Sequence, residues 1–323
     1  MAMRRSLILS LLVVVLLALF PLVAPLFNLE FYVSYVRRVL IFALAATGLN
    51  LVLGYGGMVA LGHAAFFGAG AYAVVILAGA GVQSAMVVWP AAAVLAAVLA
   101  LLVGAVSLRT RGVYFIMITL AFAQMVYYIF ISLRQYGGED GINLYGRTRL
   151  PALDLSDDVT FYYVVLAVFV VLMVAFGRLV QSRFGAALTG IRENESRMEA
   201  LGYPVYRLKL VAFVISGAMA GLAGAMLADH NLFVSPGMMH WTQSANLLIM
   251  VLVGGMGLRY GGVVGAAVML FLEEALRLWT EFWHLPMGLL LLLVVFFAPK
   301  GLAGLWDSLR RRSASQPATG GKP

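Results

Sequence analysis

The sequence predicts an all-α, polytopic membrane protein with about ten transmembrane helices. Hydrophobic residues make up 63% of its 323 positions and charged residues only 11%, a balance that water-soluble globular domains do not reach. Apolar runs recur along most of the chain, and about 20 apolar residues suffice to cross a bilayer. One long polar segment interrupts them, and it holds many of the basic residues, as inner loops of membrane proteins do.

Ten ranges have the apolar character of a span: 6–27, 35–53, 58–80, 84–107, 112–133, 160–178, 209–228, 243–257, 261–280 and 285–299. The first resembles a signal peptide, but its apolar run is long and no small-residue cleavage site follows, so we expect a retained span. Glycines interrupt the third range and end the eighth. Broken segments of this kind are tolerated at membrane depth only where protein or a cavity surrounds them.

The charge distribution sets the predicted orientation. If the polar segment 181–208 is cytoplasmic, most Lys and Arg residues fall inside and both termini are cytoplasmic. Arg37 and Arg38 then fall outside, against the rule. We predict one transmembrane domain over 1–312 and a disordered, Ser/Pro/Gly-rich cytoplasmic tail over 313–323. An odd number of spans on each side of residue 135 allows an inverted repeat, although the halves show no sequence repeat.

Several function classes are excluded by what the sequence lacks. It has no cysteine, which removes disulfides, thiolate metal sites and cysteine catalysis. It has no phosphate-binding loop motif, so it cannot bind ATP by that route. No cluster of His, Asp and Glu has metal-ligand spacing, and no nucleophile stands near a base. Inner loops explain the net charge of +8 better than nucleic acid does. We therefore predict a protein that is not an enzyme and holds no metal or cofactor.

The polar segment from Gln181 to Lys209 organises the rest of the chain. Basic and acidic residues alternate in it, and Glu193 and Arg197 stand at helical spacing, which predicts a short solvated helix. Gly202 and Pro204 should end that helix. On charge alone an ordinary cytoplasmic loop explains the segment equally well.

The residues around that predicted helix end point to a family. Glu199-Ala200-Leu201-Gly202, preceded by Arg192-Glu193-Asn194-Glu195, resembles the EAA loop of ABC importer permeases, and most closely the LivM type of branched-chain amino acid permease. In that family the loop forms a coupling helix that docks on an ATPase subunit. The resemblance implies a coupling role for Arg192, Glu195, Glu199, Ala200 and Gly202. Leu201 departs from the general pattern, which has Ala, but branched-chain members commonly carry Leu there.

A glycine-rich segment carries a second resemblance to the same family, in Leu61-Gly62-His63-Ala64-Ala65-Phe66-Phe67-Gly68 followed by Gly70-Ala71-Tyr72. Small residues let helices approach closely or unwind beside a pathway. The candidates for pathway or packing roles are Gly62, His63, Phe66, Phe67, Gly68 and Gly70. His63 is a candidate proton relay or a hydrogen-bonded structural residue. Relatives often carry Gln and Ser just before this segment, where this chain has Met58 and Ala60.

Glu273 and Glu274 are acids well inside a predicted span. Arg277 follows one helical turn later, so an ion pair is available on the same face. Charges at membrane depth should face the protein interior or a wet cavity. An internal salt bridge and a direct substrate contact are the two interpretations.

Two outer segments also resemble the family. Gly137-Gly138-Glu139-Asp140-Gly141 is similar to its Gly-Gly-x-Asp-Gly element, and 229–241 contains its Val-Ser-Pro element. Both would lie where a periplasmic binding protein docks. A further element, 297–302, fits near the C-terminus, so the resemblance covers about residues 43–305.

Taken together, the resemblance implies the permease subunit of an ATP-driven importer of branched-chain, apolar amino acids in a bacterial inner membrane. Its implied partners are a sister permease, two ATP-binding cassette subunits that bind the ATP, and a soluble binding protein; nucleic acid is not among them. The same importer type carrying urea or short amides is an alternative. An ion-coupled secondary transporter, using Glu273, Glu274 or His63, and a scaffold without transport are others.

Overall fold

The computed structural model describes residues 2–24, 30–151, 153–279, 282, 284–297 and 301. Twelve α-helices run through these residues: α1 (Ala2–Val23), α2 (Glu30–Asn50), α3 (His63–Gly79), α4 (Ala85–Ser107), α5 (Val113–Ser132), α6 (Asp158–Gln181), α7 (Arg183–Glu193), α8 (Glu195–Ala200), α9 (Val205–Asn231), α10 (Trp241–Gly254), α11 (Gly261–Trp279) and α12 (His284–Phe297). The predicted all-α class is confirmed. The predicted tail 313–323 and most of the 297–302 element lie outside the described residues.

Each of the ten predicted ranges coincides with a helix, while α7 and α8 occupy the polar segment. Five helices among the described residues are long and apolar enough to cross a membrane: Phe31–Tyr55, α4, α5, α6 and α9. The first of these continues α2 through one π-helical turn, Leu51–Tyr55. The third and eighth predicted ranges become shorter helices, α3 with 17 residues and α10 with 14. At 1.5 Å per residue α10 is about 21 Å long, less than the roughly 30 Å of a bilayer core.

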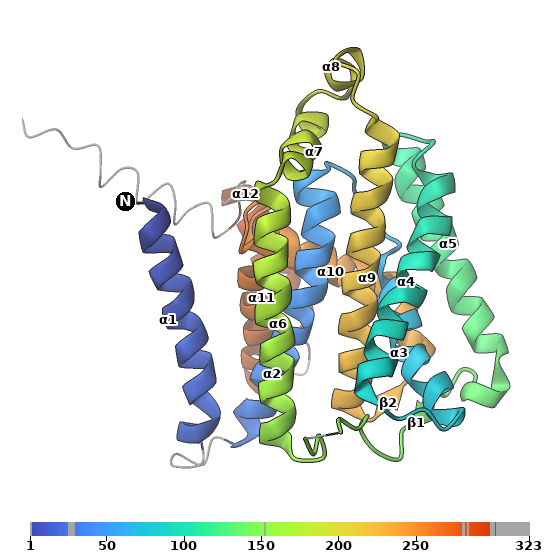
Figure 1. Ribbon diagram of the computed structural model, residues 1–323, viewed down its shortest axis with the longest axis vertical. Helices are drawn as coiled ribbons and strands as arrows, with labels where there is room; N and C mark the ends of the chain where they lie inside the picture. The colour runs from blue at the N-terminus through green and yellow to red at the C-terminus, as the bar shows by residue number, and fades with distance from the viewer. Residues whose placement is uncertain are drawn as a thin grey trace, which may run out of the picture.

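The long helices run side by side, with α7 and α8 projecting at one end of the bundle (Figure 1). We call this the α8 end. The opposite end, which we call the ribbon end, carries β1 (Ile142–Asn143) and β2 (Phe233–Val234), which pair antiparallel with Ile142 opposite Val234. Helix α1 stands beside the bundle, where the Tyr162 hydroxyl of α6 donates to the Leu17 carbonyl at 2.8 Å.

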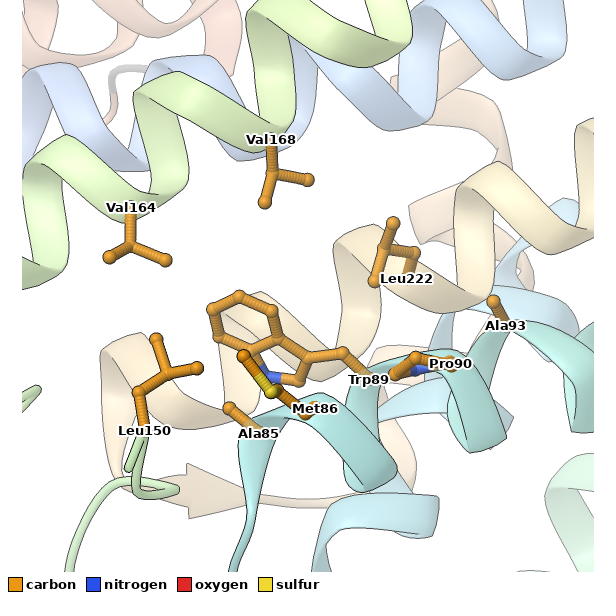
Figure 2. A pocket seen from close by; sticks show the side chains of 9 residues that line it. All are labelled: Ala85, Met86, Trp89, Pro90, Ala93, Leu150, Val164, Val168 and Leu222. Atoms are coloured by element: carbon orange, nitrogen blue, oxygen red, sulfur yellow. The ribbon is translucent and has the colours of Figure 1, made fainter. Parts of the chain in front are cut away.

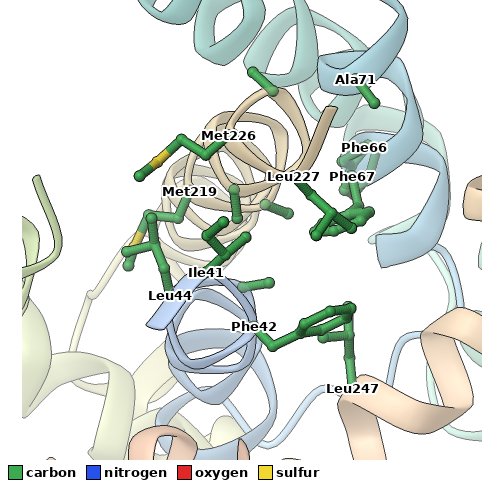
Figure 3. Close-up of a cluster of buried hydrophobic side chains, with 14 of the residues drawn as sticks. Ile41, Phe42, Leu44, Phe66, Phe67, Ala71, Met219, Met226, Leu227 and Leu247 are labelled. Carbon is green, nitrogen blue, oxygen red and sulfur yellow. The ribbon is translucent and has the colours of Figure 1, made fainter. Parts of the chain in front are cut away.

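Helix α9 forms the centre of the bundle and packs against α2, α3 and α4. The buried side chains at this crossing come from α2, α3, α9 and α10, among them Ile41, Phe66, Met219, Leu227 and Leu247 (Figure 3). Glycines let the backbones approach: a Cβ atom on Gly224 would collide with the Phe67 carbonyl. Small residues at such crossings are how membrane helices associate without a hydrophobic driving force.

Two helical units, α2–α3 and α9–α10, have the same arrangement of a long and a short helix and run in opposite directions. Helix α2 runs from the ribbon end to the α8 end, and after a non-helical return over 56–62 the short α3 begins at His63. Helix α9 runs the other way, and after a return that includes β2 and the 3-10 turn Pro236–Met239 the short α10 begins at Trp241. The two short helices meet at their N-termini, where the Ala64 amide donates to the Ser244 hydroxyl at 2.8 Å. Most residues of the two returns are buried or half-buried, although Val59 and Phe233 are 38% and 37% exposed; irregular backbone at membrane depth requires such cover.

Arg37, which runs against the positive-inside rule, is 1% exposed and belongs to a polar network at the ribbon end. It donates to His230 Nδ1 at 2.9 Å and to Asp158 Oδ1 at 3.0 Å. Arg147, from the loop between α5 and α6, donates to the same Asp158 carboxylate. The two guanidinium groups lie over the Phe161 ring, each 4.8 Å from its centre. Arg37 is thus a packed structural residue rather than a solvated loop charge, which explains the exception to the rule.

Asp229, the second acid of this network, is fully buried near the end of α9. It accepts hydrogen bonds from Trp89 Nε1 at 2.8 Å, from the Thr148 amide at 3.0 Å and from the Thr148 hydroxyl at 2.8 Å. These contacts tie α4, α9 and the long loop together. We call the set Arg37, Arg147, Asp158, Asp229 and His230 the clasp.

Candidate functional site

The polar segment 181–208, which the family resemblance predicts to be a coupling segment, folds into two helices that turn sharply at Asn194. The Asn194 side-chain oxygen accepts from the Arg197 amide at 2.9 Å, so it caps α8 at its N-terminus. Gly202 ends the segment with φ +81°, a left-handed conformation that favours glycine. Beyond α8 the side chains of Leu201 and Tyr203 are 66% and 46% exposed. The segment therefore presents apolar groups and the small residue Ala200 to the surroundings.

Ion pairs hold α8 on the bundle. Glu195 accepts from Lys209 at the start of α9, with Nζ 2.7 Å from Oε2. Arg111, in the connection between α4 and α5, lies 3.5 Å from Glu195 Oε1 and 3.1 Å from Glu199 Oε1. The pair of Arg111 with Glu199 is exposed, and exposed pairs contribute about 0–1 kcal/mol each, whereas the side chains of Lys209 and Glu195 are only 13% and 26% exposed. No local pattern in the sequence points to Arg111, because its partners stand more than 80 positions away.

Arg192 differs from the other predicted coupling residues, because its guanidinium group is directed at the transmembrane helices. It donates to the Gly54 carbonyl, and its side chain lies against Gly57 and Gly257. Both of these glycines have positive φ angles, +68° and +73°, and a Cβ on either would meet the Arg192 side chain. The coupling segment therefore contacts the backbone at both broken units.

Asn50 completes the same contact region. Its side-chain oxygen accepts from the Gly257 amide at 3.0 Å, and its side-chain nitrogen donates to the Leu258 carbonyl at 2.8 Å. We call Asn50, Gly54, Gly57, Arg192 and Gly257 the inner node. The clusters of glycine at 54–57 and 254–257 are the sequence signal that could have located it, since glycine marks close backbone approach.

The glycine-rich segment lies inside the bundle, at the start of α3. His63, Phe66 and Phe67 are fully buried. The Ser216 hydroxyl donates to the Gly48 carbonyl at 2.6 Å and lies 2.8 Å from His63 Nε2. Because its proton is already used, the hydroxyl accepts from His63 Nε2, which places the imidazole proton on that nitrogen. His63 thus holds α3 to α9.

The remaining candidates of this segment make close packing contacts. Gly62 approaches Thr119 of α5, Gly68 approaches Met239, and Gly70 approaches the Gly221 backbone of α9. The His63, Phe66 and Phe213 rings meet edge to face, with centres 5.5 or 5.6 Å apart. The structure brings all six candidates together at the junction of α3 with its neighbours.

The charges predicted to lie within a span are on α11, toward the ribbon end. Arg277 Nη2 is 2.8 Å from Glu273 Oε1, and Arg38 of α2 approaches the same oxygen at 3.8 Å. The Arg277 side chain is 48% exposed, while that of Glu273 is 19% exposed. Glu274 is half-buried beside them. Arg38, the second residue against the positive-inside rule, therefore also faces an acid.

The two motifs that were predicted to lie outside the membrane meet at the ribbon. Gly137, Gly138 and Gly141 all have positive φ angles, and β1 then pairs with β2, which precedes the Ser235-Pro236 turn. Glu139 and Asp140 are exposed. Near the start of α6 the Asp157 carboxylate accepts from the Thr160 hydroxyl and amide, which lowers the pKa of Asp157.

Comparison with known proteins identifies the family to which the chain belongs. Residues 31–298 match the family described as branched-chain amino acid transport system / permease component. The high-affinity branched-chain amino acid transport system permease protein LivM of Escherichia coli (strain K12) is 32% identical over 290 residues, which cover 81% of this chain and 68% of that protein. Its counterpart from Salmonella typhimurium is 31% identical over 297 residues, covering 84% and 69%. A probable LivM protein of Methanocaldococcus jannaschii is 24% identical over 159 residues, covering 44% and 46%. No solved structure matches.

Proposed function

Because the chain belongs to the family of branched-chain amino acid transport permeases, we propose that it forms the path by which an ATP-driven importer moves leucine, isoleucine, valine or related apolar amino acids into the cytoplasm. It is a multi-pass membrane protein and a transport component, not an enzyme. The observation that carries the proposal is the family match over 31–298, which includes the bundle, both broken units and the α8 segment.

The α8 end is the proposed docking site of the ATP-binding cassette subunits. Leu201 and Tyr203 offer exposed apolar contacts, and Ala200 and Gly202 leave room for a partner's surface. Glu195 and Glu199 would set the register of docking, since charge placement at interfaces decides orientation. A sister permease would complete the path, and a binding protein would deliver cargo at the ribbon end, where the two outer motifs meet.

The proposed topology has ten helical segments in a bacterial inner membrane with both termini cytoplasmic. The opposite directions of the α2–α3 and α9–α10 units support an inverted repeat, in which each half contains one broken segment. A cysteine at the exposed Tyr145 should react with an impermeant maleimide from outside, and one at the exposed Ser196 only from inside. The chain has no cysteine of its own, so labelling has no background. External labelling at Ser196 would reverse the topology.

The inner node is the proposed transmission element. When the ATPase subunits close and displace α7 and α8, Arg192 would carry the displacement to Gly54, in the π-helical turn that follows α2, and to Gly257, just beyond the end of α10. Alternating access needs two packings that differ by only a few kcal/mol, and glycine-rich contacts without interlocked side chains allow such packings.

The test of the proposed function is uptake by the reconstituted complex, with its own binding protein. We expect saturable, ATP-dependent accumulation of labelled leucine and no accumulation of labelled urea. Urea uptake without leucine uptake would show that the proposed cargo is wrong, but it would agree with the proposed importer function. Leucine accumulation that persists without ATPase subunits would contradict the importer itself.

A further inference from the structure

An open apolar groove lies on the side of the bundle between α4 and α6, near the ribbon end (Figure 2). Its volume is about 340 Å³. All nine residues that line it are apolar, and they are Ala85, Met86, Trp89, Pro90 and Ala93 of α4, Leu150 of the long loop, Val164 and Val168 of α6, and Leu222 of α9.

The local structure explains why a space remains here. Helix α4 packs on α9, whereas α6 packs on α2. The two helices therefore have different packing partners, and a space remains between them. Pro90 lies inside α4, where it cannot donate to the Met86 carbonyl, and a helix bends at such a position. Both walls belong to helices that are long and apolar enough to cross a membrane, so the groove lies at the depth of the bilayer core.

The lining does not suit the transported cargo. A free amino acid carries an ammonium and a carboxylate group, and a buried charge needs polar partners. The one side-chain donor in the wall, Trp89 Nε1, is already taken by Asp229 Oδ2 at 2.8 Å. The groove therefore selects a hydrocarbon chain.

A basic residue stands at the ribbon end of the groove. Arg149 is exposed and precedes Leu150 of the groove wall. Its backbone is fixed at the start of α4, because its amide donates to the Gln83 carbonyl at 2.6 Å and its carbonyl accepts from the Ala85 amide at 2.8 Å. An exposed arginine next to an apolar groove matches one phospholipid, because its guanidinium group can bond the phosphate while the groove takes the acyl chain.

We propose that this groove binds one acyl chain of a membrane phospholipid, with the phosphate group near Arg149. The bound chain would pack on Trp89 and so support the hydrogen bond from Trp89 to the clasp. This lipid would be a structural ligand, separate from the cargo path.

The test uses the purified permease complex in vesicles of phosphatidylethanolamine and phosphatidylglycerol, in which the phosphatidylglycerol carries a diazirine in its acyl chain. After illumination we expect labelled peptides from both groove walls, residues 85–93 and 164–168. Val168→Trp fills the groove and should abolish labelling of 85–93. The matched control is Val171→Trp on the same helix, whose side chain is 65% exposed and does not line the groove; it should leave that labelling unchanged. Val164→Phe serves as a second filling variant if Val168→Trp does not accumulate.

Three outcomes would overturn the proposal. Labelling of 85–93 that persists in both filling variants would mean general contact with lipid. Labelling suppressed by leucine would assign the groove to the cargo. A disulfide between a cysteine at Ala93 and a cysteine in the sister permease would mean that a protein helix covers the groove. Uptake is a separate measurement, so the lipid-binding proposal can be wrong while the proposed transport function is correct.

Discussion

The two ends of the bundle are built from different interactions. The ribbon end is held by the clasp, in which a buried arginine and a buried aspartate each bond to several elements of the chain. The α8 end is held by the exposed ion pair of Arg111 with Glu199, by the less exposed pair of Lys209 with Glu195, and by contacts between Arg192 and glycine backbone. Buried polar networks with satisfied hydrogen bonds specify one arrangement, whereas exposed pairs are weak. The difference indicates that the ribbon end keeps its shape while the α8 end can move.

The largest expected effect is at the clasp. Arg37→Ala removes hydrogen bonds to His230, Asp158 and Ser34 from a fully buried site. Hydrogen bonds to charged groups contribute about 1.5–3 kcal/mol each, and the cavity adds to the loss. We expect most of the protein to be lost from the membrane, measured by its level and by the thermal stability of the purified remainder.

Arg38→Ala is the matched control, because Arg38 is the neighbouring arginine and its side chain is 35% exposed. Its loss should lower stability only slightly. If both variants accumulate and melt alike, the clasp is not what holds the ribbon end, and the contrast between the ends is wrong.

The second effect should be on function rather than on folding. Glu199→Lys, or Gly202→Trp, alters the proposed docking face, where a like-charge contact can cost several kcal/mol. Glu199 also loses its contact with Arg111, but that pair is exposed and weak. We expect normal protein levels, with ATPase subunits that no longer co-purify or no longer respond to loaded binding protein. Normal uptake in both variants would remove α8 from the coupling role.

The third effect separates docking from transmission. Arg192→Ala should leave the ATPase subunits bound, because Arg192 contacts Gly54, Gly57 and Gly257 rather than the exposed face of α8. ATP hydrolysis should continue while leucine uptake falls. Arg197→Ala is the control, since Arg197 is an exposed arginine on α8 itself. Loss of ATPase binding in Arg192→Ala would place this residue on the docking face, as the family resemblance implies.

The sequence predicted well where the pattern is local. Ten apolar ranges coincide with helices because each helix must satisfy its own backbone in lipid, and the charged segment forms α7 and α8 at the position expected. Position in the bundle was harder to predict. Gln243 looks like the outer start of a span, but α10 begins inside the bundle beside α3, because the return before it enters the protein.

Contacts between residues that are far apart in the sequence were the hardest to predict. Arg37 appeared as a violation of a loop rule because its partners, Asp158 and His230, are 121 and 193 positions away. The direction of Arg192 could not be read either, since a helix in a charged segment shows which residues share a face but not which face meets the bundle. The glycine clusters at 54–57 and 254–257 gave a partial signal, because close backbone approach requires them.

The smallest expected effect concerns Glu273 and Arg277, which lie toward the rigid ribbon end but in a more exposed setting than the clasp. The sequence alone left an internal salt bridge and a direct substrate contact open for these charges. With the Arg277 side chain 48% exposed, the pair should contribute about 1 kcal/mol or less. Arg38 offers Glu273 a second partner at 3.8 Å, so Arg277→Ala does not leave the carboxylate without a basic partner.

We therefore expect Arg277→Ala, Glu273→Gln and the double variant to melt within a few degrees of the unaltered protein. A double-mutant cycle on thermal stability measures the coupling, and Arg277→Ala should be slightly less stable than the double variant. A coupling of several kcal/mol would show that this pair stabilises α11 as strongly as Arg37 stabilises the ribbon end. The rigid part of the molecule would then include α11.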